Sequence, residues 1–164
     1  MEYVYIGKIV STPGIKGEIK IISDFEYKDK VFKTKANIYI GKNHIKEVID
    51  TYRHHKQYDM ITLEGYNNIN EVLKYMKEPV YILKEELNID NNDILICDII
   101  GMEAYVQDRY IGVVKDIYNT GINYKVIEIF NKNNKTLVPY HKDFIEFVDK
   151  NNNKIVFKGG MFDA

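Results

Sequence analysis

The sequence predicts an all-β protein made of two small β-barrels in tandem, with one short helix in the first barrel. Apolar and polar residues alternate along short segments over almost the whole chain, which is the period of a half-buried strand. Clusters of Gly, Asn and Asp separate these segments and predict frequent turns. A polar stretch at residues 85–93 predicts a linker between barrels at residues 1–84 and 94–164.

The first half begins with a strand over residues 3–9, in which Val4, Ile6 and Lys8 share one face and Ile9 lies on the other. A loop is expected over residues 11–17, because Pro13 fixes its φ and two glycines allow positive φ. Further strands are expected at residues 18–22, 37–40, 44–53, 60–63 and 80–83. Short strands with frequent turns favour a closed or Greek-key barrel.

One segment of the first half has the period of a helix. Its apolar residues recur at i, i+3, i+4 and i+7: Ile69, Val72, Leu73 and Met76. Asn67 or Asn68 is available as the N-cap, and Pro79 ends the segment. We expect this helix to plug one mouth of the first barrel.

The second half repeats the strand pattern without a clear helix. Strands are expected at residues 94–97, 103–106, 110–117, 125–130, 135–138, 145–148 and 154–157. Turns are expected between them at residues 108–109, 119–121, 131–134 and 151–153. A second all-β barrel follows from this pattern.

The composition excludes several classes of protein. A net charge of −1 disfavours a general nucleic-acid coat. The charge is uneven, however: residues 1–84 carry 14 Lys and Arg against 11 Asp and Glu, and residues 85–164 carry 9 against 13. The first half could therefore favour phosphate and the second a basic protein.

The cellular compartment is also predicted from composition. No apolar run approaches the length of a membrane span, and the first residues lack the basic and apolar regions of a secretory signal. The single cysteine, Cys97, cannot form an intramolecular disulfide, which is typical of a reducing compartment. We expect a cytoplasmic protein that does not engage a membrane.

The sequence offers no catalytic constellation, metal site or cofactor motif. His54 and His55 are adjacent on an expected strand, so their side chains point to opposite faces and cannot easily bind one metal. Cys97 lies in an apolar run and is expected to be a buried structural thiol. An enzyme that uses His54 or His55 with Asp59 is an alternative, but the sequence shows no third convergent polar group.

A binding surface is the remaining interpretation. Aromatic and basic residues interleave over residues 52–58, a combination that suits contacts with RNA phosphates and bases. A barrel strand with a solvated outer face explains the same residues equally well.

Four blocks of the chain, in order, resemble the RimM family. Residues 6–10 and Thr12-Pro13-Gly14-Ile15-Lys16-Gly17-Glu18-Ile19 resemble its opening strand and His-Gly-x-x-Gly-Glu turn. Residues 52–56, 63–65 and the helix at 68–77 resemble its second block, and residues 98–102 resemble the opening of its second domain. Residues 111–117, 120–121, 137–140 and 160–163 follow in the expected order.

This resemblance implies an N-terminal barrel like those of translation factors and a C-terminal PRC-type barrel. It also implies a non-enzymatic ribosome maturation factor that binds small-subunit ribosomal protein nineteen and the pre-small ribosomal subunit. Such a factor assists late assembly of the small-subunit head and processing of 16S rRNA. We expect it to act as a monomer.

Our hypothesis for the binding residues is a clamp made of the two unlike halves. An apolar patch near the linker would hold the ribosomal protein: Ile94, Leu95, Pro139, Tyr140 and Phe144. Lys16, Arg53 and Lys56 would contact rRNA phosphates. The chain departs from the family at two places, since Pro13 replaces the usual His, and Ile94 and Leu95 replace a tyrosine pair. A stand-alone RNA-binding barrel protein that acts on tRNA or mRNA is the alternative.

Overall fold

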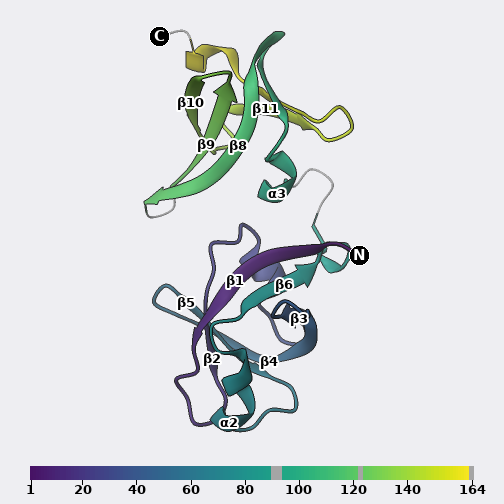
Figure 1. The fold of residues 1–164 in the computed structure, drawn as a ribbon, viewed down its shortest axis with the longest axis vertical. Coiled ribbons are helices and arrows are strands. Elements are labelled where there is room, and N and C mark those ends of the chain that lie inside the picture. Colours follow the sequence, from purple (N-terminus) through teal and green to yellow (C-terminus); the bar gives the residue numbers. More distant parts are fainter. Residues whose placement is uncertain (90–93, 122–123, 163–164) are drawn as a thin grey trace. The chain divides into compact units, whose positions relative to one another are not determined.

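The computed structural model describes residues 1–89, 94–121 and 124–162, which form two compact units, Met1–Asp90 and Asn91–Ala164. Strands make up most of both units (Figure 1). The predicted all-β class with two successive domains is therefore confirmed. The first two residues of the predicted linker, Glu85 and Glu86, belong to a 3₁₀ turn, η2 (Lys84–Glu86). Residues 90–93 of that linker lie outside the described residues.

Unit 1 is a closed barrel in which every expected strand is present. The six strands follow one another around the barrel in the order β1–β2–β5–β4–β3–β6. Their bounds are β1 (Tyr3–Ser11), β2 (Ile19–Ile22), β3 (Asn37–Ile40), β4 (Ile45–His55), β5 (Tyr58–Leu63) and β6 (Pro79–Leu83). Isoleucine dominates the interior, and burying each such side chain contributes about 1.5–3 kcal/mol to folding.

Strand β1 does not keep a single inward face. Val4 and Ile6 are buried, but an irregularity in its pairing with β6 between Tyr5 and Gly7 shifts the phase, so that Ile9 is buried and Lys8 is exposed. The prediction that Lys8 shares a face with Val4 and Ile6 is therefore wrong. Strict alternation cannot reveal a bulge, because the extra residue changes the phase only where it is inserted.

The predicted helix of unit 1 is present but short. It comprises α2 (Ile69–Val72) followed by the 3₁₀ turn η1 (Leu73–Tyr75), and the side chain of Asn68 accepts a hydrogen bond from the Glu71 backbone as the N-cap. Because the helix tightens into a 3₁₀ turn, Tyr75 is buried and Leu73 remains 47% exposed. Figure 1 shows α2 at one end of the barrel.

A single-turn helix, α1 (Lys28–Val31), was not predicted from the sequence. Val31 and the following Phe32 are buried, which fixes this turn against the barrel. Four residues are too few to show a helical period, and most short helices are stabilised by tertiary packing rather than propensity.

Unit 2 is one six-stranded sheet in the order β10–β9–β8–β7–β12–β11. Its strands are β7 (Glu103–Val106), β8 (Arg109–Gly121), β9 (Tyr124–Asn131), β10 (Asn134–Pro139), β11 (Ile145–Asp149) and β12 (Lys154–Phe157). The pair β7 and β12 is parallel and the other pairs are antiparallel. The turn predicted at residues 119–121 is wrong, since these residues continue β8, and residues 122–123 lie outside the described residues.

The start of unit 2 differs from the prediction. Residues 94–97 do not form a strand; a single-turn helix, α3 (Ile96–Ile99), lies there and buries Ile99. A short apolar run is compatible with either a strand or a buried helical turn, and its period cannot decide between them. On this helix Cys97 is exposed, so the prediction of a buried thiol is also wrong.

Within the residues that the structure describes, no helix is long and apolar enough to span a membrane.

Gly112 on β8 is required by close packing. Its φ is +141°, and a Cβ built at this position would lie 2.4 Å from the backbone oxygen of Phe130 on the adjacent β9. Both the backbone conformation and the contact exclude a larger residue.

We therefore expect Gly112→Ala to lower the free energy of unfolding by about 2–4 kcal/mol, measured by urea denaturation. Gly121→Ala is the matched control on the same strand, because no atom of the described residues lies within 4 Å of its added Cβ. The control should change stability by less than about 1 kcal/mol. Equal losses in the two variants would contradict the packing argument.

Candidate functional site

The hairpin of β4 and β5 carries most of the polar residues that the sequence singles out in unit 1. In its ladder Arg53 lies opposite Met60, His54 opposite Asp59 and His55 opposite Tyr58. Arg53, His54 and His55 are exposed, whereas Asp59 on the facing strand has no exposed surface. A buried carboxylate requires partners, because an unpaired charge in the interior is costly.

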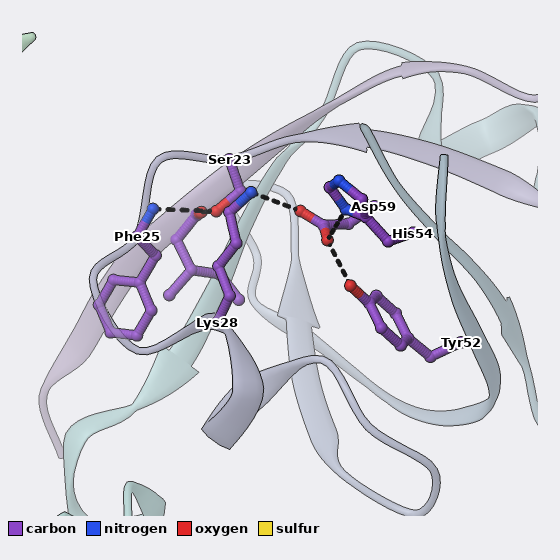
Figure 2. A network of polar contacts seen from close by, with 7 residues as sticks. Ser23, Phe25, Lys28, Tyr52, His54 and Asp59 are labelled. Carbon is purple, nitrogen blue, oxygen red and sulfur yellow. Dashed lines mark hydrogen bonds and ion pairs between the residues drawn. The ribbon is translucent and has the colours of Figure 1, made fainter. Parts of the chain in front are cut away.

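Three side chains surround the Asp59 carboxylate (Figure 2). The Tyr52 hydroxyl donates a hydrogen bond to Oδ1 over 2.7 Å, and Nζ of Lys28 lies 3.0 Å from Oδ2. Nδ1 of His54 lies 3.5 Å from Oδ1. Burial of Tyr52 and its hydrogen bond to Asp59 raise the pKa of the Tyr52 hydroxyl to about 12.

The Asp59 cluster, meaning Asp59 with Tyr52, Lys28 and His54, joins the hairpin to α1. Lys28 is the first residue of α1, and the ring of Phe32 just after that helix stacks on Tyr52 with centroids 6.2 Å apart. The segment before α1 is also fixed, since the Ser23 hydroxyl donates to the backbone oxygen of Ile6 and accepts from the Phe25 backbone (Figure 2). The cluster therefore sets where the lysine-rich α1 lies on the barrel.

The structure corrects one sequence-based argument about this cluster. The sequence pairs His54 or His55 with Asp59 and shows no third polar group, but Tyr52 and Lys28 also converge on Asp59. A general base must reach the proton that it removes, and Asp59 is fully covered. The arrangement positions side chains rather than presenting the carboxylate to a substrate. Among the described residues, no group of three or more His, Cys, Asp and Glu could hold a metal ion.

The three residues expected to contact rRNA differ in their surroundings. Lys16 and Lys56 are exposed, the first in the loop before β2 and the second at the tip of the β4–β5 hairpin. Arg53 donates two hydrogen bonds of 2.8 Å, from Nε and Nη2, to the carboxylate of Glu18. That pair lowers the pKa of Glu18 and raises the pKa of Arg53, so both groups stay charged and largely neutralise each other.

The apolar patch predicted on unit 2 is only partly at the surface. Leu95 is 2% exposed, so it contributes almost no surface to the predicted patch. Ile94 and Tyr140 are partly buried and pack against the core of unit 2. Pro139 is half-buried at the end of β10, and half-buried Phe144 lies edge-to-face against His141 with centroids 6.2 Å apart.

Sequence reasoning missed Leu137 on β10, which is 52% exposed and is the most exposed large apolar residue among those of unit 2 whose side chains the structure describes. It lies two residues before Pro139, and positions two apart in a strand share one face. The alternation of β10 was a signal that could have added Leu137 to the predicted patch.

Together these features define a two-domain β protein with charged and apolar surfaces suited to binding macromolecules. The model of the RimM N-terminal domain matches residues 4–87, and the model of the RimM PRC barrel domain matches residues 96–162. The chain belongs to the RimM family, as its sequence blocks predicted.

Two sequence relatives of similar length, each more than 30% identical to this chain, support this assignment. The chain is 32% identical over 169 residues to a protein of Exiguobacterium called ribosome maturation factor RimM, with 99% of this chain and 98% of the relative covered. It is 36% identical over 164 residues to a protein of the same name from Ligilactobacillus salivarius, with 96% of each covered. The crystal structure of a 16S ribosomal RNA processing protein RimM from Pseudomonas aeruginosa has 20% identity and a TM-score of 0.43, over 96% of this chain and 97% of that one.

The Asp59 cluster predicts that loss of the buried Asp59 carboxylate lowers stability much more than loss of the partly exposed Glu64 carboxylate. Asp59→Asn removes a buried negative charge from Lys28 and Tyr52, and should lower the free energy of unfolding by about 2 kcal/mol or more in urea denaturation at neutral pH. Glu64→Gln is the control, because Glu64 pairs with Lys35, whose side chain is 73% exposed. This exposed pair is screened by solvent and should contribute little to stability. Similar small losses in both variants would show that the cluster does not anchor α1.

Proposed function

We propose that this protein is a ribosome maturation factor of the small subunit, in which unit 2 binds ribosomal protein nineteen and unit 1 contacts rRNA. It would assist late assembly of the subunit head and processing of 16S rRNA in the cytoplasm, as a monomer and without catalysis. The observation that carries the proposal is similarity over nearly the whole length of relatives that are named ribosome maturation factors. Both domain types of the family are present in one chain.

The surface of unit 2 supports a basic protein as its partner. Residues 85–164 carry an excess of four acidic groups, 13 against 9. The apolar residues with surface near the end of β10 would form the centre of the interface: Leu137, Pro139, Tyr140, Phe144 and, at the start of the unit, Ile94. An apolar centre with a polar rim is the usual composition of such interfaces.

The surface of unit 1 supports contact with phosphates. Residues 1–84 carry an excess of three basic groups, 14 against 11. Lys16 and Lys56 are exposed and form no ion pair within the described part of the chain, so they can contact phosphates directly. Arg53 contributes less than the sequence suggests, because Glu18 already neutralises it.

The test is a binding titration of the full chain against purified small-subunit ribosomal protein nineteen at two salt concentrations, with total RNA as competitor. We expect saturable one-to-one binding to the protein. We expect Tyr140→Ala with Phe144→Ala to weaken it about tenfold or more, because aromatic residues near the centre of an interface contribute most.

Phe147→Ala is the matched control, since Phe147 is a 48% exposed aromatic residue on β11. Because Tyr140 also packs on the core, the double variant must first show a cooperative unfolding transition. Unchanged affinity of a folded double variant would exclude the patch. Binding to RNA alone would instead favour a stand-alone RNA-binding protein.

The pair of Arg53 and Glu18 predicts a substitution that strengthens RNA binding. Glu18→Gln should strengthen RNA binding severalfold at low salt, because it releases Arg53, and should steepen the salt dependence by about 0.7 in the logarithmic slope for a single strand. Glu146→Gln removes the same charge from exposed β11 and controls for net charge. An equal gain in both variants would show that Arg53 does not contact RNA.

A further inference from the structure

Unit 1 contains a pocket of about 210 Å³ beside α1, lined by the loop from α1 to β3, the end of β6 and the turn η2. Three apolar side chains at its floor are core residues that each leave only a small exposed surface: Val31, Ile82 and Leu83 are 3%, 4% and 8% exposed. Ala36 also lines the pocket, and its small side chain leaves room for a ligand. The rest of the lining is largely polar: Lys30, Lys33, Lys35, Asn37, Glu86 and Asn88. An apolar floor with polar groups at its rim is typical of a ligand site.

Two positive charges lie at the rim of this pocket. Lys30 and Lys33 are exposed and form no ion pair within the described residues. The third lysine of the rim, Lys35, differs because its ammonium group is held by Glu64. Unpaired lysines beside an apolar floor favour a ligand that carries a ring and a phosphate.

One carboxylate at the rim is held in a fixed orientation. Oε2 of Glu86 accepts a hydrogen bond of 2.7 Å from the Asn37 side-chain amide, and Oε1 accepts one from the Tyr39 hydroxyl. These bonds lower the pKa of Glu86, the Tyr39 bond most strongly, so the carboxylate stays ionised. An ionised carboxylate has about four acceptor positions, so each oxygen can accept one more hydrogen bond.

Two adjacent acceptor oxygens, such as those of the Glu86 carboxylate, discriminate among the four RNA bases. The Watson–Crick edge of guanine presents two adjacent N–H donors, which match the two oxygens of a carboxylate. Adenine and cytosine place an acceptor beside their amino group, and uracil has one donor between two acceptors, so each of these would direct a lone pair at Glu86. A buried or fixed polar group left without its partner costs affinity.

We propose that this pocket binds one guanine nucleotide of a single-stranded RNA segment. The base would lie on Val31, Ile82 and Leu83 with its edge against Glu86, and its phosphates would lie near Lys30 and Lys33. The proposal rests on the proposed function in taking RNA as the ligand, and it adds a site and a base preference. The Asp59 cluster supports it, because Lys28 fixes the helix that carries Lys30.

The experiment measures binding of the full chain to fluorescently labelled short oligouridine with one central guanosine or one central adenosine. We expect the guanosine oligomer to bind about tenfold more tightly, the discrimination typical of a good bidentate contact. Ala36→Leu fills the pocket and leaves every charge in place, so it should abolish the preference but retain the salt dependence. Glu86→Gln should also abolish the preference.

A charge variant separates phosphate contact from base contact. Lys30→Gln with Lys33→Gln should weaken both oligomers equally and reduce the logarithmic salt slope by about 1.4. The matched control, Lys135→Gln with Lys150→Gln, removes two exposed charges from unit 2 and should leave binding to both oligomers unchanged. Thermal unfolding of every variant shows that the fold is retained.

Several results would overturn the proposal. They are equal affinity of the wild-type chain for the two oligomers, a preference that survives Ala36→Leu, and equal losses in the two lysine pairs. Displacement by guanosine monophosphate at the same concentration as the oligomer would overturn the assignment to an RNA strand. A chain that shows the preference but does not bind ribosomal protein nineteen supports the pocket and contradicts the proposed partner of unit 2, so the two failures are distinguishable.

Discussion

The surface of unit 1 depends on the buried carboxylate of Asp59. Because a charge without exposed surface must be compensated, the Tyr52 hydroxyl and the Lys28 ammonium group are drawn to it from two different elements. This requirement fixes a four-residue helix that could not be stable alone, and the stack of Phe32 on Tyr52 reinforces it. One interaction inside the barrel wall therefore decides where the basic segment after residue 28 lies.

The charged side chains of unit 1 are not equivalent, although a count of charges in the sequence gives each of them the same weight. Arg53 is neutralised by Glu18 and Lys35 by Glu64, whereas Lys30 and Lys33 have no acidic partner within the described residues. A net charge of −1 for the whole chain hides this difference. Affinity for phosphate is set by the uncompensated cations and by how firmly the backbone holds them, not by the sum over the chain.

The strands and the N-cap at Asn68 could be predicted because their signals are local: alternation for strands, and a side-chain acceptor before a helical period. The single-turn helices α1 and α3 could not, since four residues show no period. The site was predictable only in part. Arg53 and Asp59 could be placed on one hairpin, but the convergence of Lys28 and the pairing of Arg53 with Glu18 join residues far apart in the chain. The burial of Leu95 likewise depends on tertiary packing.

Strand β1 also determines when the barrel can close. Its first part pairs with β6, from Tyr3 opposite Leu83, and its second part pairs with β2, so β1 is the seam between the two ends of unit 1. During synthesis the hairpin of β4 and β5 can form as soon as it emerges, but the start of β1 must wait, exposed, for residues 79–83. Pairing of β1 with β6 joins residues about 80 positions apart in the chain, from Tyr3 to Leu83. Pairing between residues so distant in sequence is slow. The start of β1 is therefore an unpaired strand edge that is open to aggregation while translation is under way.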